Sequence, residues 1–133
     1  MPITPTVKAI LETAPAKALA TISNADINVV PVSMIRVNES SIWLFDFFMN
    51  KTAHNACATS ICALTAWENM TGVQIKGDVT YKTEGALFDE AVSWVKTQNP
   101  DRVVKGLLII EPKAIFDISP GKTFTPEELG HIV

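Results

Sequence analysis

The sequence predicts a mainly β domain of the α+β class, an antiparallel barrel of six or seven short strands with helices attached to it. First, apolar and polar residues alternate over several short segments, most clearly from Val73 to Tyr81, and such alternation is typical of strands with one buried face. Second, helical spacing is rare, whereas an alternating α/β fold needs a helix after nearly every strand. Third, 133 residues with 47% apolar content fit a single domain, residues 1–133, with a real core.

The first half of the chain is predicted to form one helix and three strands. Thr4 and Pro5 are typical of a helix start, because threonine caps a helix and proline is tolerated at its first position, and Pro15 ends this helix. Residues 17–23 alternate in a pattern that fits a strand, and further strands are predicted over residues 27–37 and 41–48, all joined by polar turns. Because proline has no N–H to donate to a ladder, we expect Pro31 to release strand pairing in the second of them.

The second half is predicted to carry a short helix over residues 52–58 and one long helix over residues 84–97. The apolar stripe of the long helix consists of Leu87, Phe88, Ala91, Val92 and Val95. Strands are expected over residues 60–67, 73–81, 105–110 and 114–118, with a hinge at Pro112 between the last two. Thr125 and Glu128 have the spacing of a capping box, which predicts a last helical turn.

Composition excludes several classes of partner. The net charge is −3, the pI is near 5.3 and no cluster of lysine and arginine is present, which argues against nucleic acid. The apolar runs are too short to cross a bilayer and the first residues lack a secretory pattern, so we expect a cytoplasmic protein with no membrane contact. The mean hydropathy of +0.22 is high for a small protein and indicates a buried oligomer interface or a cofactor cavity.

Cysteine and histidine chemistry is sparse. Cys57 and Cys62 match no zinc or redox spacing, and we expect both to be small buried apolar residues. Two histidines are too few for a metal site, and no serine or cysteine forms a recognisable nucleophilic arrangement with them. His54 is expected to lie on the surface of the short helix.

A strongly apolar segment ends abruptly at Asn50, Lys51 and Thr52, where the short helix begins. The first N–H groups of a helix have no intrahelical partner and the helix dipole is positive there, so this place stabilises a phosphate dianion. Thr52 is expected to cap the turn and donate its hydroxyl, while Lys51 adds a mobile charge. The same residues also fit a solvated turn with an ordinary cap, so the order of the surrounding elements has to decide.

In this order of elements the chain resembles the FMN-binding split-barrel proteins of the pyridoxamine 5′-phosphate oxidase-like family, especially their small FMN-binding members. The resemblance covers about residues 5–119, and its best local marker is Lys51-Thr52-x-x-Asn55 after the apolar strand. It implies a split barrel that binds FMN between the two subunits of a homodimer, which would account for the apolar excess.

The resemblance also implies where FMN lies. Lys51 and Thr52 would hold the phosphate with support from Asn55, and Thr65 to Trp67 would lie near the phosphate or the ribityl chain. The strand end from Asp46 to Phe48 would run beside the isoalloxazine ring, opposite the segment from Pro31 to Met34. The implied binding residues are Pro31, Val32, Ser33, Met34, Asp46, Phe47, Phe48, Lys51, Thr52, Asn55, Thr65 and Trp67.

Some single residues keep two interpretations. Asp46, a carboxylate inside an apolar run, either faces solvent at the strand end or places a charge beside the flavin. Trp43, Trp67 and Trp94 are expected to pack in the core or an interface rather than stack on a ring.

The function implied by the resemblance is that of an FMN-dependent oxidoreductase or electron-transfer protein with a small-molecule or redox-protein partner. We do not expect oxidation of pyridoxamine 5′-phosphate itself, because only Arg102 and His131 follow the long helix as groups that could grip such a substrate. Two alternatives remain open: a flavin carrier or sensor without turnover, and the same barrel with a deazaflavin or haem as its ligand.

Overall fold

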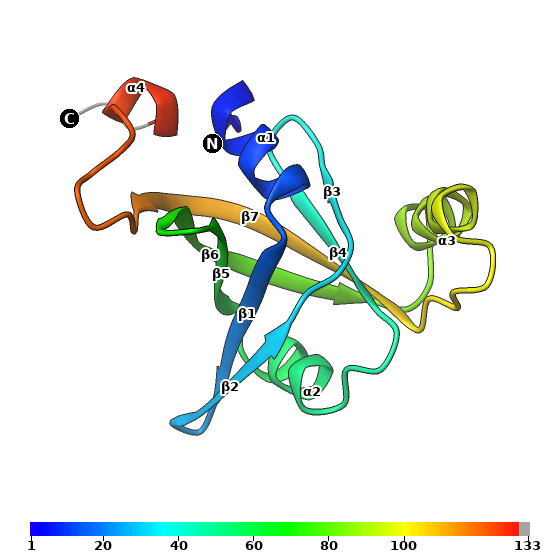
Figure 1. Cartoon of the computed structure of the whole chain (residues 1–133). Helices are drawn as coiled ribbons and strands as arrows, with labels where there is room; N and C mark the ends of the chain where they lie inside the picture. Colours follow the sequence, from blue (N-terminus) through cyan, green and yellow to red (C-terminus); the bar gives the residue numbers. More distant parts are fainter. Residues whose placement is uncertain (131–133) are drawn as a thin grey trace.

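The computed structural model describes residues 1–130, which form one curled sheet with helices around it (Figure 1). In chain order the elements are α1 (Pro5–Thr13), β1 (Ala16–Ser23), β2 (Asp26–Pro31), β3 (Ile35–Val37), β4 (Ile42–Asp46), α2 (Lys51–Ala58), β5 (Ile61–Glu68), β6 (Thr71–Lys82), α3 (Ala86–Gln98), β7 (Gly106–Asp117) and α4 (Pro126–Leu129). The predicted mainly β, antiparallel split barrel with flanking helices is confirmed.

The barrel is split at Pro31. The seven strands pair in the order β2-β1-β5-β6-β7-β4-β3, so β2 and β3, which follow each other in the chain, lie at opposite edges of the sheet. The predicted single strand over residues 27–37 is therefore two strands, and residues 32–34 bridge the two edges. Hydrogen bonds do not close the described sheet into a ring. Strand β2 ends at Pro31, and one more bond, from the N–H of Val32 to the carbonyl of Lys17, follows before the chain crosses to β3.

The last strand is continuous where the sequence predicts a hinge. Pro112 sits within β7 opposite Gly77, and the pairing register shifts between Lys76 and Gly77, so that Lys113 is the extra residue of a bulge. A Cβ at residue 77 would collide with the carbonyl of Glu111, so this close approach requires glycine. The bulge lets the strand bend around the barrel while its pairing with β6 continues.

Strand β4 supports two hydrophobic clusters. Its residues are buried on both faces: Ile42 and Leu44 belong to the core inside the barrel, whereas Trp43 and Phe45 belong to a second cluster beneath α3. This double burial explains why the segment reads as a continuous apolar run rather than as an alternation.

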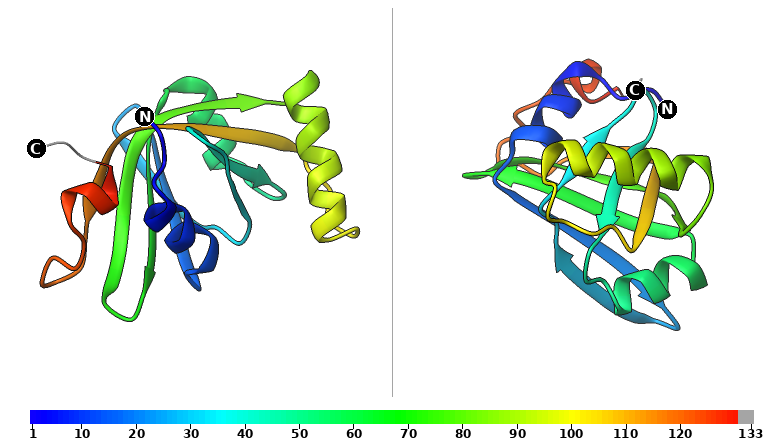
Figure 2. Two further views of the ribbon diagram at one scale, coloured as in Figure 1. Left: turned by 90° about the horizontal axis from the view of Figure 1, so that it is seen from above. Right: turned by 90° about the vertical axis from the view of Figure 1, so that its right-hand side faces the viewer.

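The helices lie at two ends of the sheet. Helices α1 and α4 lie together, joined by a hydrogen bond from the Thr4 hydroxyl to the carbonyl of Glu128, whereas α3 lies at the other end of β6 and β7 (Figures 1 and 2). The predicted N-cap at Thr4 and the capping box of Thr125 and Glu128 are both present. Helix α3 differs from its predicted stripe in one residue, because Leu87 is 44% exposed. None of the described helices combines the length and apolar character needed to cross a membrane.

Candidate functional site

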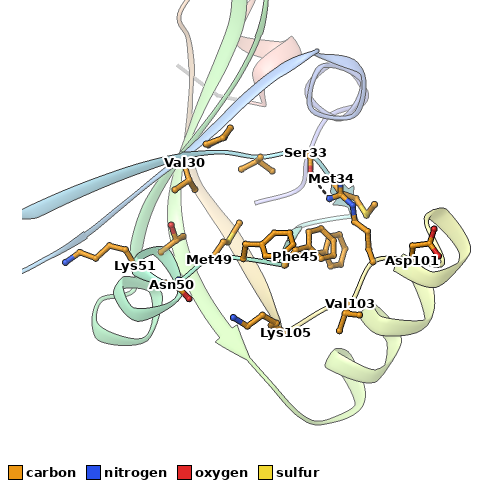
Figure 3. A pocket seen from close by; sticks show the side chains of 16 residues that line it. Val30, Ser33, Met34, Phe45, Met49, Asn50, Lys51, Asp101, Val103 and Lys105 are labelled. Atoms are coloured by element: carbon orange, nitrogen blue, oxygen red, sulfur yellow. Dashed lines mark hydrogen bonds between the residues drawn. The ribbon is translucent and has the colours of Figure 1, made fainter.

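A cavity of about 820 Å³ opens where the barrel is split. Three segments line it: the bridge between the sheet edges, the turn from β4 into α2, and the loop between α3 and β7 (Figure 3). The lining residues are Val30, Pro31, Val32, Ser33, Met34, Phe45, Phe47, Phe48, Met49, Asn50, Lys51, Thr52, Asp101, Arg102, Val103 and Lys105. The lining is mostly apolar, with polar and charged groups at its ends, as is usual for a small-molecule site of this size.

Asp46 fixes the turn on one side of the cavity. Its side chain is only 1% exposed, and its Oδ1 accepts a hydrogen bond from the backbone N–H of Met49 at 2.6 Å. Its Oδ2 accepts one from the hydroxyl of Tyr81, also at 2.6 Å. Burial and the hydrogen bond to Asp46 raise the pKa of Tyr81 above its ordinary value.

This network corrects two predictions. Strand β4 ends at Asp46 and not at Phe48, because the Asp46 carboxylate binds the backbone three residues on and turns the chain out of the ladder. Phe47 and Phe48 consequently lie in a bend rather than at a strand end. The carboxylate does not face solvent as one interpretation expected, and Asp46 is not among the residues that line the cavity.

The two phenylalanines of the bend differ in exposure. Phe47 packs against Phe45, with 6.4 Å between the ring centroids. Phe48 is 90% exposed at the rim of the cavity. One aromatic ring thus belongs to the wall, and the other is available to a ligand or to a second protein surface.

Helix α2 begins at the cavity, but its first residues act differently from the prediction. Asn50 is the N-cap residue and makes no side-chain hydrogen bond to the first turn, so the cap does not occupy the helix N–H groups. Thr52 is inside the helix, and its buried hydroxyl accepts a hydrogen bond from Nδ2 of Asn28 at 2.8 Å instead of capping the turn. Lys51 is exposed and pairs with Asp26 at 2.9 Å.

Besides Asp46, three more predicted residues lie outside the cavity lining. Asn55 is a fully buried residue of α2 that contacts β1: its Nδ2 donates to the hydroxyl of Thr21 at 3.1 Å, and its Oδ1 has no partner among the described residues. Thr65 and Trp67 are in β5, paired with β1, and the structure does not bring them to the cavity within this chain.

Arg102 and Lys105 line the cavity although the sequence analysis did not select them as site residues. Nη1 of Arg102 donates to the hydroxyl of Ser33 at 2.9 Å (the dashed line at Ser33 in Figure 3), and the guanidinium lies 4.7 Å from the ring centroid of Phe47. No local motif marks Arg102, since only the return of the chain from α3 to β7 brings it here. His131, the other group considered with it, lies outside the described residues.

The tryptophans and cysteines that the sequence analysis considered lie away from the cavity lining. Trp43 is buried in the core, and Trp94 stacks on Phe45 with 5.3 Å between ring centroids. Cys62 is buried, and burial together with Asp78 raises its pKa to about 12. Cys57 is exposed, so the prediction that both cysteines are buried is wrong for this residue.

His54 is exposed on α2 as expected. Within residues 1–130, no group of three or more histidine, cysteine, aspartate and glutamate side chains could hold a metal ion.

These features define a class of protein: a split barrel with an apolar cavity at the split and a helix N-terminus at one end of that cavity. The chain belongs to the pyridoxamine 5′-phosphate oxidase family, whose sequence model matches residues 3–125. No curated protein sequence matches the chain significantly.

The names of solved structures with the same fold state different ligands or none. HupZ from Group A Streptococcus has a TM-score of 0.79 at 20% identity, covering 92% of this chain and 99% of its own. An FMN-binding protein from Syntrophomonas wolfei subsp. wolfei has a TM-score of 0.74 at 15% identity, covering 86% of this chain and 84% of its own.

Two further structures carry other ligand names. HutZ, the haem storage protein from Vibrio cholerae, has a TM-score of 0.68 at 12% identity, covering 87% of this chain and 94% of its own. An F420 reductase has a TM-score of 0.63 at 11% identity, covering 82% of this chain and 94% of its own. At these identities the likeness establishes the fold, and the choice of ligand has to be argued from the cavity.

Proposed function

We propose that the protein is an FMN-binding flavoprotein that acts as an oxidoreductase or electron-transfer protein. The observation that carries the proposal is that one apolar cavity combines aromatic and aliphatic walls with the N-terminus of a helix headed by Lys51. A flat ring system joined to a phosphate needs this combination, since the ring is apolar and the phosphate is a dianion.

The residues present fit FMN at both of its parts. The side chain of the cap residue Asn50 does not bind the first-turn N–H groups of α2. The Thr52 hydroxyl accepts a hydrogen bond from Asn28, so its own O–H can still donate to a phosphate. The ion pair between Lys51 and Asp26 is exposed and therefore weak, so the Lys51 ammonium is free to turn to a phosphate. Residues 31–34 and the Phe47 ring provide the apolar walls for the isoalloxazine.

Bound FMN would supply hydride or electron transfer, and the protein would supply position and exclusion of water. Pro31, Val32 and Met34 contribute side chains without hydrogen-bonding groups to one wall, and Met49 extends the apolar surface on the other side. No acid–base pair recognisable as catalytic lines the described part of the cavity, so a carrier without turnover remains the second function to be tested.

We also propose that the working form is a homodimer. Phe48 is left 90% exposed at the cavity rim, and the exposed residues Ile27, Val29 and Ile61 lie on β2 and β5, the two strands that flank β1. Large apolar side chains gathered in this way are typical of a surface that a second subunit covers. Light scattering coupled to size exclusion is expected to give twice the 14.5 kDa mass of one chain.

The central test compares FMN with riboflavin, which has the same ring but no phosphate. The double variant Lys51→Ala/Thr52→Ala is expected to weaken FMN binding at least tenfold, because two contacts to the phosphate of about 1.5–3 kcal/mol each are removed. Riboflavin affinity is expected to change little. Binding is followed by quenching of flavin fluorescence, circular dichroism checks folding, and Lys8→Ala on α1 is the matched lysine control.

Three outcomes would contradict the proposal. FMN binding no tighter than riboflavin binding in the wild type would mean that no phosphate site exists. An unchanged FMN affinity in the double variant would place the phosphate elsewhere. A Soret band, or the absorption of a deazaflavin, in the purified protein would assign the cavity to haem or to a deazaflavin, the ligands that the names of HutZ and the F420 reductase suggest.

A second measurement separates an oxidoreductase from a carrier. Bleaching of bound FMN by NADH or NADPH is expected of an oxidoreductase and not of a carrier without turnover.

A further inference from the structure

The two arginines of the chain differ in how their charge is balanced. Arg36 forms an ion pair with Glu90 at 2.9 Å and lies between the rings of Trp43 and Trp94. Arg102 contacts the hydroxyl of Ser33 and the face of Phe47, and no carboxylate of the described residues lies within ion-pair distance of it. A half-buried guanidinium that has no carboxylate partner and lies beside an open cavity is suited to bind an anionic ligand.

Arg102 is held in place for this role by neutral groups. Ser33 accepts one of its five N–H donors and the Phe47 ring supports the plane of the guanidinium, so its orientation is restricted while its charge stays unpaired. The Ser33 hydroxyl is itself a potential donor at the same place. Lys105 adds a further positive charge to those of Arg102 and Lys51 in the cavity lining, whose single carboxylate, Asp101, does not pair with Arg102.

This end of the cavity is separate from the end proposed for the FMN phosphate. Lys51 comes from the start of α2 and Arg102 from the loop between α3 and β7. In Figure 3 Lys51 lies at one side of the cavity and Asp101, the neighbour of Arg102, lies at the opposite side. A ligand bound at Lys51 therefore leaves the Arg102 group for something else.

We propose that Arg102 and Ser33 bind the carboxylate of a small organic substrate, which makes the substrate class of this protein an organic acid. The planar guanidinium fork matches a carboxylate through two parallel N–H···O bonds, which favours a carboxylate over a neutral group. The same fork can hold a phosphate, so the test includes a phosphate probe. The proposal rests on the proposed FMN site, because the substrate is taken to share the cavity with FMN.

The test uses benzoate as the probe and benzamide, its neutral analogue, as the control ligand. Calorimetric titrations are carried out on the FMN-loaded and on the FMN-free protein. Wild type is expected to bind benzoate at least tenfold more tightly than benzamide. Arg102→Gln is expected to lose at least tenfold in benzoate affinity, Arg102→Lys is expected to be intermediate because it keeps the charge without the fork, and Arg36→Gln is the matched control that leaves benzoate binding unchanged.

Four results would overturn the proposal. Benzoate and benzamide binding the wild type equally would remove the carboxylate site, and an unchanged benzoate affinity in Arg102→Gln would remove Arg102 from it. Phenyl phosphate binding more tightly than benzoate would change the substrate class. A selective loss of FMN but not riboflavin affinity in Arg102→Gln would place the cofactor phosphate at this arginine. If wild type binds no FMN at all, the proposed function fails, and the titrations of the FMN-free protein still decide the Arg102 site.

Discussion

The end of β4 and the start of α2 carry one charged residue each, and the two are treated in opposite ways. Asp46 is buried, and both of its carboxylate oxygens receive hydrogen bonds, from Met49 and from Tyr81. Lys51 is exposed, and its partner Asp26 is exposed as well. The Asp46 carboxylate stabilises the fold through its hydrogen bonds, whereas the Lys51 ammonium is available to a ligand.

The difference shows how one short segment both builds a wall and leaves a contact open. A buried carboxylate is tolerated only when its hydrogen bonds are complete, so the Asp46 network has one geometry and fixes the bend that carries Phe47. An exposed ion pair contributes little to stability and exchanges partners easily. Substitutions at the two places should therefore separate stability from binding.

The largest expected effect is on stability, at Asp46. Asp46→Ala removes the acceptor of two buried hydrogen bonds and is expected to lower the free energy of unfolding by about 2–4 kcal/mol. Lys51→Ala, the matched control on the other side of the comparison, is expected to change it by less than about 0.5 kcal/mol. Urea unfolding followed by tryptophan fluorescence measures both. Equal losses in the two variants would show that the network does not stabilise the fold.

A second effect is a pH dependence at Tyr81. Its pKa is raised by burial and by the hydrogen bond to Asp46, so the folded state keeps the phenolic proton at a pH where the unfolded chain loses it. The associated stability is fully present below about pH 10, the pKa of an unperturbed tyrosine, and is lost as the pH rises above it. The chain has a single tyrosine, so absorbance at 295 nm reports on this residue directly.

The expected titration is a tyrosine that resists ionisation in the folded protein and ionises together with unfolding. Asp46→Asn, which removes the negative partner but keeps the size of the side chain, is expected to bring the midpoint closer to that of a free tyrosine. A wild-type midpoint at the ordinary value would contradict the network.

The smallest expected effect is on binding, at Asp26. Asp26→Asn removes the exposed partner of Lys51 and a negative charge near the proposed phosphate site. FMN affinity is expected to rise by about two- to fivefold at low ionic strength, and the gain is expected to disappear in high salt because exposed charges are screened. Stability is expected to stay the same, and a loss of FMN affinity would mean that Asp26 holds Lys51 in its binding position.

Local signals in the sequence predicted much of the fold. The alternation from Val73 to Tyr81 marked β6, and the caps at Thr4 and Thr125 marked α1 and α4. Pro31 correctly marked the place where pairing is released. One error came from a long-range contact, because Pro112 stays within a strand where a bulge opposite Gly77 accommodates it. The other is local, because β4 stops early where Asp46 accepts a hydrogen bond from Met49 in its own turn.

In the candidate site, too, the residues marked by local sequence were predicted, and those brought in by long-range pairing were not. Lys51 and Thr52 were selected because a strand that feeds a helix start is visible in the local sequence. Arg102 was not selected, because it reaches the cavity only through the pairing of β7 with β4, which sets Gly106 opposite Asp46. That register is a property of the whole sheet, so no short stretch of sequence contains it.

Gly106 lies at this junction. A Cβ at this position would overlap the ring of Tyr81, which lies against the bare backbone with its hydroxyl on Asp46. A homologue that acquires a side chain at position 106 therefore has to displace or replace the aromatic ring at 81, and it loses the hydroxyl that donates to the carboxylate of Asp46. The three positions should be inherited, and replaced, as a set.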